Sequence, residues 1–209
     1  IRTCYLWSKE SMKIVCFDME GTLTPEIWQE VAKETNVSEL LKTTRDIPSF
    51  SELMDYRISL MKDHNISFSF LKEVASQIEP LDGAKDFLGK VRNDFQVVIL
   101  SDTFYELALP LMEKLGNPLL LCHRLEIEKD IITGYKLRAA KAKRQAIEAF
   151  SKMGYSCIAV GDSYNDLQMF EVAEHSFFIH APKVITEEHS SIPSLNSYTD
   201  LLRELETLK

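Results

Sequence analysis

Five short apolar runs, separated by helical stretches, limit most strongly how this 209-residue chain can fold. They occupy residues 13–17, 96–100, 119–122, 157–160 and 177–179. Each run is apolar throughout rather than alternating, which is typical of strands buried on both faces of a parallel sheet. Helical stretches at 83–95 and 142–154 stand between them. This alternation predicts an α/β fold with a doubly wound parallel sheet.

Two regions interrupt the alternation. Residues 124–137 alternate in polarity around a turn near Lys129 and Asp130, which predicts a β-hairpin that could be a pocket flap or a contact in a homodimer. Residues 25–79 contain only helical patterns, too long for one crossover. We therefore expect an α/β core domain of residues 12–24 and 80–209, with a helical cap of residues 25–79 inserted after the first strand. Residues 1–11 are assigned no function.

Composition excludes several classes of function. The net charge of −8 argues against a nucleic-acid partner. No apolar run reaches the roughly 20 residues of a membrane span. Cys16, Cys122 and Cys157 lie in apolar runs, and no cysteine has a zinc-site spacing. A reducing, cytoplasmic location is the simplest expectation.

Polar residues follow three of the apolar runs. The first group is Asp18, Glu20 and Thr22, the second is Ser101 and Asp102, and the third is Asp162, Asn165 and Asp166. The carboxyl ends of parallel strands meet at one edge, where ligands of open sheets bind. Carboxylates gathered there repel one another unless a cation joins them, and oxygen ligands favour Mg²⁺. Lys141 and Lys143 lie at the start of the helix that precedes the third group, and together with the polar residues they suggest a site for a phosphoryl group.

Each group alone has a plainer interpretation. Two acids after a strand are often only solvated, a serine there is often a turn or helix cap, and residues 161–166 could form an ordinary polar turn. The order of all three groups, with lysines between the second and third, makes chance assembly improbable.

The complete set resembles the haloacid dehalogenase superfamily of phosphotransferases. "DMEGT" looks like the first motif of that family, Ser101 the second, a lysine of "KAKRQ" the third and "GDSYND" the fourth. Within the superfamily the chain is most similar to phosphoserine phosphatases, and among these to bacterial bifunctional phosphoserine phosphatase/homoserine phosphotransferases, which also have Glu at the position of Glu20. "PEIW", "TTRDIP", "VVILSDTFYE" and "LLCH" carry this similarity.

The resemblance implies roles for the reacting groups. Asp18 would be the nucleophile that forms an aspartyl-phosphate, and Glu20 the general acid and base. Mg²⁺ would be held by Asp18, by the backbone carbonyl of Glu20 and by Asp162, with Asp166 acting through water or orienting the site. Phosphoryl oxygens would be bound by the following residues: Ser101, Lys143 (or Lys141 in its place), Gly21 and Thr22.

The resemblance also implies a pocket for an amino acid. Glu26 would bind the ammonium group of phosphoserine, and Arg57 its carboxylate in a bidentate pair. The alternative for Arg57 is a surface charge on an amphipathic helix. Arg45 is a further candidate, or else a partner in a structural ion pair with Asp46 or a nearby acid. Asn165 would bind substrate or phosphate.

The expected function is a Mg²⁺-dependent phosphoserine phosphatase that can transfer the phosphoryl group to homoserine. One alternative is a phosphatase for another small phosphomonoester. Another is a receiver-type signalling domain, which combines an acidic cluster, Ser or Thr, Lys and Mg²⁺ on a similar sheet. A receiver has no use for a helical cap or for an acid beside its aspartate.

Overall fold

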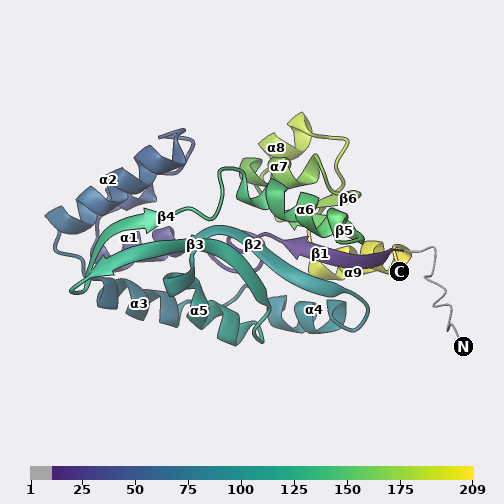
Figure 1. The fold of residues 1–209 in the computed structure, drawn as a ribbon, viewed down its shortest axis with the longest axis horizontal. Coiled ribbons are helices and arrows are strands. Elements are labelled where there is room, and N and C mark those ends of the chain that lie inside the picture. Colours follow the sequence, from purple (N-terminus) through teal and green to yellow (C-terminus); the bar gives the residue numbers. More distant parts are fainter. Residues whose placement is uncertain (1–10) are drawn as a thin grey trace, which may run out of the picture.

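The strands form one sheet in the order β4-β3-β2-β1-β5-β6-β7 (Figure 1). The computed structural model describes residues 11–209, so the expectation for residues 1–11 lies almost wholly outside the described residues. The strands are β1 Met12–Phe17, β2 Gln96–Phe104, β3 Leu119–Glu128, β4 Ile131–Lys136, β5 Tyr155–Gly161, β6 His175–Ile179 and β7 Ser194–Leu195. Neighbouring strands are parallel except β3 and β4. The predicted α/β fold with a parallel sheet is confirmed.

Helices cover both faces of this sheet. On one face lie α4 (Ala84–Val91), α5 (Tyr105–Lys114) and α9 (Tyr198–Thr207), and on the other lie α6 (Ala142–Lys152), α7 (Leu167–Phe170) and α8 (Lys183–Glu188). In β1, Val15 and Phe17 pack in the hydrophobic core that contains α4, α5 and α9. Ile14 and Cys16 pack in the core on the other face, which contains α6, α7 and α8. This double burial is why the strand sequences are apolar at successive positions.

Strand β1 is the point where the order of the sheet reverses. The chain adds β2 and β3 on one side of β1, and later β5 and β6 on the other. The carboxyl ends of β1 and β5 therefore lie side by side, and the Asp18 N–H donates to the Val160 carbonyl at 2.8 Å. A crevice at such a reversal is where open α/β sheets bind ligands.

The predicted hairpin is confirmed, but two predicted strands are too short. Lys129 and Asp130 have φ values of 48° and 67°, as a tight hairpin turn requires. The predicted strand 119–122 and the first hairpin strand are one strand, β3. Strand β2 does not end at residue 100 but continues to Phe104, with a register shift between Leu100 and Phe104. Ser101 and Asp102 thus lie within an irregular part of β2 rather than beyond its end.

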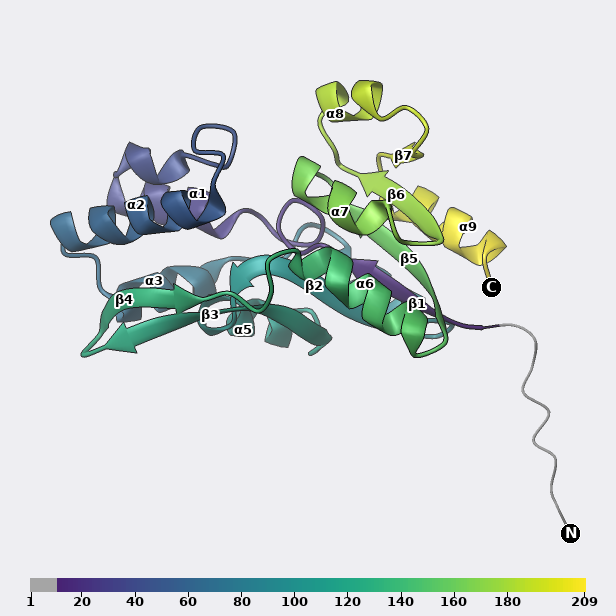
Figure 2. The ribbon, with the colours of Figure 1, turned by 45° about the horizontal axis from the view of Figure 1, so that its top comes forward.

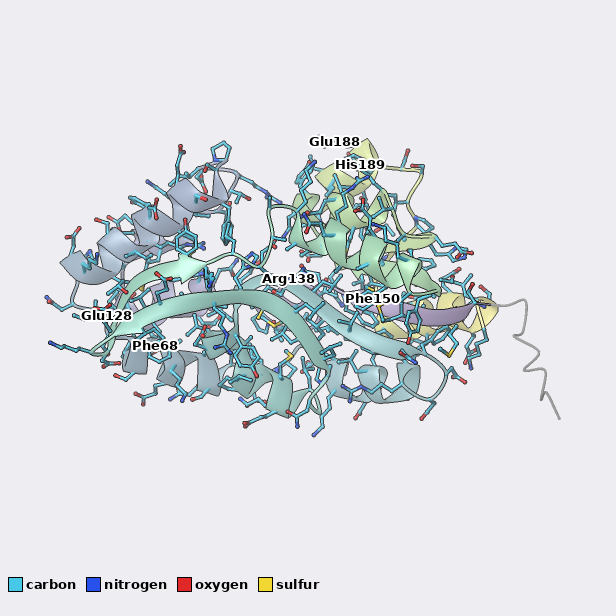
Figure 3. All side chains as sticks on the ribbon, in the orientation of Figure 1. Phe68, Glu128, Arg138, Phe150, Glu188 and His189 are labelled. Carbon is cyan, nitrogen blue, oxygen red and sulfur yellow. The ribbon has the colours of Figure 1, made fainter. Side chains whose placement is uncertain are left out.

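The region predicted to be helical contains α1 (Ile27–Thr35), a 3₁₀ helix (Ser38–Leu41), α2 (Phe50–Asp63) and α3 (Phe68–Gln77). Figure 2 shows these helices gathered with the β3–β4 hairpin at one end of the molecule. Helix α3 is attached at both ends. At its start Ser69 donates backbone N–H and hydroxyl hydrogen bonds to Asp130 (2.7 and 2.6 Å), near the labelled Phe68 and Glu128 in Figure 3. Beyond its end Lys114 donates to the Ile78 carbonyl at 2.7 Å.

Among residues 11–209, none of the helices has the length and apolar character needed to cross a membrane.

Candidate active site

A buried lysine lies between two carboxylates at the centre of the crevice. Lys143 Nζ is 2.7 Å from Asp18 Oδ1 and 2.6 Å from Asp166 Oδ1. All three side chains are almost fully buried. Asp18 directly follows β1, Lys143 lies in the first turn of α6, and Asp166 follows β5. Asp162 completes the group, because one oxygen of each of the three aspartates lies within 4.8 Å of the others.

The loop after β5 holds Asp166 in a fixed direction. Its Oδ2 accepts hydrogen bonds from the backbone N–H groups of Asp162 and Ser163, both at 3.0 Å. Asp166 also closes a capping box with Ser163 at the start of the short 3₁₀ helix Tyr164–Asp166. The residue before this loop is Gly161, whose added Cβ would lie 2.4 Å from Asp166 Cγ. Glycine is therefore needed for the close approach.

The loop after β1 is fixed by contacts from distant parts of the chain. Gly21 has a φ of 78°, and an added Cβ there would lie 2.4 Å from Asp162 Oδ2. The Thr22 hydroxyl donates to Asp162 Oδ1 at 3.3 Å. Tyr198 in α9 donates its hydroxyl to the Thr22 carbonyl at 2.7 Å. Tyr198 could not be predicted from the sequence, because no local pattern relates it to a loop 176 residues away.

The charges of the cluster are unbalanced. Burial alone would lower the pKa of Lys143, but Asp166 and Asp18 raise it well above its ordinary value, so the lysine is a cation. Burial, and then the charge of Asp166, raise the pKa of Asp162 to about 7. The cluster has one ammonium group and three carboxyl groups, so a further positive charge would be stabilised there.

Glu20 lies in the loop after β1, and its side chain reaches the start of α1. Its Oε1 accepts a hydrogen bond from the Ile27 backbone N–H at 2.8 Å. Burial, followed by the charge of Glu26, raises the pKa of Glu20 to about 8, although the Ile27 N–H, Arg57 and Lys143 oppose the shift. The carboxyl is therefore protonated at neutral pH and can donate a proton. Its side chain is not among the three acids that cluster around Lys143.

The polar residues of β2 lie beside the same crevice. Ser101 is buried, and its Oγ accepts the Thr103 N–H at 3.2 Å. Asn165 donates from Nδ2 to Asp102 Oδ2 at 3.1 Å. Lys143 lowers the pKa of Asp102, which places this acid within its electrostatic range. The structure thus brings all three predicted polar groups to one edge of the sheet.

The two candidate lysines differ sharply in environment. Lys143 is 1% exposed and paired with Asp18 and Asp166. Lys141 is exposed at the N-cap position of α6. Of the two, only Lys143 is placed to meet a group at Asp18.

Arg57 is buried on α2 with an unused donor. It is 7% exposed, its guanidinium lies 4.5 Å from the centre of the Trp28 ring, and one terminal nitrogen donates to the Lys42 carbonyl at 2.8 Å. Among the described residues, Arg57 Nε is the one buried polar side-chain atom that has no hydrogen-bond partner. Burial lowers the pKa of Arg57 to about 10 against the opposing charges of Glu20 and Glu26. Arg57 is therefore not the surface charge of the alternative interpretation.

Glu26 lines an open cavity of about 720 Å³ beside the loop after β1. Gly21, Thr24 and His180 also line it. Although the Glu26 side chain reaches solvent, desolvation raises its pKa, and Arg57 opposes this. Glu20, Glu26 and Arg57 are thus within electrostatic range of one another.

Arg45 lies beside the loop after β5. Its guanidinium is 5.9 Å from the centre of the Tyr164 ring. Asp46 accepts hydrogen bonds from Thr43 instead of pairing with Arg45. No ion pair of Arg45 is found within residues 11–209.

The motifs and the fold match a known family. Residues 12–174 match the model of the haloacid dehalogenase-like hydrolases. This chain belongs to that family. It is 45% identical over 194 residues to phosphoserine phosphatase ThrH of Pseudomonas aeruginosa, covering 92% of this chain and 95% of that protein. It is 43% identical to a phosphoserine phosphatase of Pseudomonas syringae pv. tomato, covering 93% of this chain and 82% of that protein.

Solved structures have the same fold. A substrate-bound phosphoserine phosphatase complex matches with a TM-score of 0.79 and 24% identity, covering 96% of this chain and all of that one. A phospho-aspartyl intermediate analogue of phosphoserine phosphatase matches with a TM-score of 0.77 and 23% identity, covering 93% and 99%. The family assignment confirms the resemblance found in the sequence and favours a hydrolase over a receiver domain.

The acidic cluster fits a divalent cation. Asp18, Asp162 and Asp166 supply hard oxygen donors of the kind that Mg²⁺ prefers. Burial, and then the charge of Asp166, raise the pKa of both Asp18 and Asp162. A bound cation would favour the charged form of both carboxyl groups.

The close approach at Gly161 gives a test of this geometry. We expect Gly161→Ala to destabilise the protein by about 1–3 kcal/mol, because its Cβ collides with a carboxylate that cannot swing away. Gly89→Ala is the control, since Gly89 is exposed in α4 with no atom within 4 Å, and alanine there should stabilise by about 0.5–1 kcal/mol. Chemical denaturation measures both, and equal effects would contradict the crowding.

Proposed function

We propose that this protein is a Mg²⁺-dependent phosphatase for small phosphomonoesters, with phosphoserine as its main substrate and an aspartyl-phosphate as its intermediate. The observation that carries the proposal is the buried Asp18–Lys143–Asp166 cluster. Glu20, whose pKa is raised to about 8 mainly by burial, lies two residues from Asp18. Relatives at 43–45% identity that are named phosphoserine phosphatases support the substrate.

The reaction would run in two steps. Lys143 binds Asp18 Oδ1, so Oδ2 is the oxygen that attacks phosphorus while the P–O bond to the alcohol breaks. Glu20 gives its proton to the leaving alcohol oxygen. In the second step water attacks the phosphorus, Glu20 takes a proton from it, and the bond to Asp18 breaks. Ser101, Lys143 and the loop at Gly21 and Thr22 would hold the phosphoryl oxygens.

Mg²⁺ would be held by Asp18, Asp162 and the Glu20 backbone carbonyl, with Asp166 orienting the site. When bound, it would supply positive charge that lets a phosphate dianion approach these carboxylates. The protein's own part is to fix the donors, which the two amides on Asp166 and the Thr22 hydroxyl on Asp162 accomplish.

Arg57 and Glu26 would select an amino acid ester. Arg57 Nε has no hydrogen-bond partner among residues 11–209, and the guanidinium lies 4.5 Å from the centre of the Trp28 ring. These contacts would orient the guanidinium before a carboxylate arrives. Glu26 faces an open cavity, where it can bind an ammonium group. Asn165 and, less directly, Arg45 remain candidates for further substrate contacts.

We also propose that homoserine can replace water as the acceptor. Residues 25–79 would act as a cap that limits bulk water over the core of residues 12–24 and 80–209. Homoserine, one methylene longer than serine, has the same carboxylate and ammonium groups, so proximity would favour its hydroxyl. Another small phosphomonoester remains the alternative substrate.

Location and assembly are further expectations. Cys16, Cys122 and Cys157 are free thiols, which agrees with a cytoplasmic protein. The hairpin is the candidate contact of a homodimer.

Asp18→Asn should reduce turnover by about 10⁴-fold or more, because an amide oxygen is a poor nucleophile. The fold should remain, since Asn has the same shape and Lys143 keeps Asp166 as a partner. Phosphate release and mass spectrometry of trapped enzyme are the measurements. Asp55→Asn, at an exposed acid on α2, is the control. Full activity of Asp18→Asn with deamidation excluded would disprove the nucleophile.

Mg²⁺ should be required for activity and should also stabilise the protein. At 100 times its dissociation constant, Mg²⁺ should stabilise by about 2.7 kcal/mol, because it binds the folded cluster. Thermal unfolding with Mg²⁺ or with EDTA measures this, and Asp162→Asn should reduce the shift. Ca²⁺ should compete without supporting turnover, since it prefers more ligands. Undiminished activity in excess EDTA would exclude the metal.

Phosphoserine should be hydrolysed when alone, and added L-homoserine should divert phosphate into O-phosphohomoserine. Phosphorus NMR of the products measures this. If saturating homoserine yields only inorganic phosphate, the transfer is excluded and the hydrolysis stands.

Arg57→Ala should weaken both reactions by about 1.5–3 kcal/mol, because both ligands lose the same charged hydrogen bonds. Arg124→Ala is a matched control, since its guanidinium also lies over a ring, that of Tyr105 at 4.7 Å, but is exposed on β3. Kinetics with both variants check this. Equal effects of the two substitutions would mean that the amino acid pocket is elsewhere.

A further inference from the structure

A buried histidine on β3 faces the active-site crevice. His123 is 3% exposed, and its Nδ1 accepts the Arg138 backbone N–H at 3.1 Å. A neutral imidazole that accepts at Nδ1 carries its proton on Nε2. Nε2 lies 3.6 Å from Asp102 Oδ1, so the N–H faces this carboxylate.

Asp102 joins this histidine to the loop after β5. While Oδ1 faces His123, Oδ2 accepts the hydrogen bond from Asn165 Nδ2. Burial would raise the pKa of Asp102, but Lys143, His123 and Asn165 together hold it at about 2, so the group is an anion at neutral pH. It is also the residue after Ser101. Asp102 therefore connects β2, β3 and the loop that carries Asp162 and Asp166.

His123 is itself fixed from several directions. The Phe50 ring at the start of α2 lies 5.7 Å from the imidazole, edge-on, and the Phe104 ring lies 6.2 Å away. Arg138, labelled in Figure 3 on the segment between β4 and α6, donates a side-chain hydrogen bond to the Ala142 carbonyl beside Lys143. The imidazole thus stands between the helices of residues 25–79 and the crevice.

We propose that His123 is a positioning residue that, through Asp102, holds the Asn165 amide toward the phosphoryl site. Asp102 accepts one N–H of the Asn165 amide, and the amide oxygen accepts a hydrogen bond from the Ser163 hydroxyl. The second N–H has no partner among residues 11–209, so we assign it to the substrate. The inference rests on the proposed function, because it assigns Asn165 to the binding of a phosphate ester. Phe50 makes the position of His123 depend on α2.

The test is a double-mutant cycle between His123 and Asn165, with phosphoserine as substrate. His123→Phe keeps a ring among Phe50 and Phe104 but removes both nitrogens, and we expect kcat/KM to fall about tenfold. The kcat/KM of Asn165→Ala should fall by at least as much as that of His123→Phe. The double variant should be no slower than Asn165→Ala alone, because the histidine acts only through the amide.

Three further variants separate positioning from a structural role. His123→Gln should restore most of the activity, since its amide N–H can replace Nε2–H. Asp102→Asn keeps the shape of the side chain that lies between His123 and Asn165. If His123→Phe does not fold, the double-mutant cycle is measured with Asp102→Asn in its place. His175→Gln is the matched control, because His175 lies 4.0 Å from Glu174 but away from the crevice. Its kcat/KM should be unchanged.

The outcomes distinguish this inference from the proposed function. If the wild-type protein hydrolyses no phosphomonoester, the proposed function is wrong. If the wild type is active but the losses of kcat/KM in His123→Phe and Asn165→Ala multiply in the double variant, then His123 does not act through Asn165 and the inference is overturned. Failure of His123→Gln to recover activity while its Tm matches the wild type would overturn it as well.

Discussion

The ion pairs of Lys143 with Asp18 and Asp166 are the interaction on which the crevice depends. Removing such charges from water costs several kcal/mol for each ion, and a buried pair often repays little of that as stability. The cluster is therefore better explained by chemistry than by folding. Its lysine is the one cation within hydrogen-bond distance of Asp18 in the described part of the chain, and it sets the oxygen of Asp18 that remains free.

The order of the strands creates this cluster from distant segments. Because β1 is central, the ends of β2 and β5 flank Asp18 on both sides. Helix α6 precedes β5 along the chain and starts at the same edge, so it delivers Lys143 to the gap. The two glycines at 21 and 161 then let the loops approach the carboxylates of Asp162 and Asp166. Each part of the site is a consequence of the parallel topology.

The sequence allowed the fold and most of the crevice to be predicted, because both depend on local signals. Apolar runs identify buried strands, and the polar residues after three of these runs identify the edge at which ligands bind. The irregular end of β2 was not predictable, because its pairing with β3 continues past polar residues that look like a strand end. His123 and Tyr198 were missed for a related reason. Their partners, Asp102 and Thr22, are neighbours only after the chain has folded.

In the proposed mechanism, helix α1 would join acid catalysis to substrate recognition. Its first N–H fixes Glu20, its N-cap residue is Glu26, and its Trp28 supports Arg57. A shift of α1 would therefore move the proton donor and the amino acid pocket together. In the proposed mechanism the same Glu20 must serve a leaving serine and an incoming acceptor, and both are held by contacts on or beside this helix. The choice between water and an alcohol would then depend less on the reactivity of the acceptor than on whether its ammonium and carboxylate groups hold it against α1 while the aspartyl-phosphate exists.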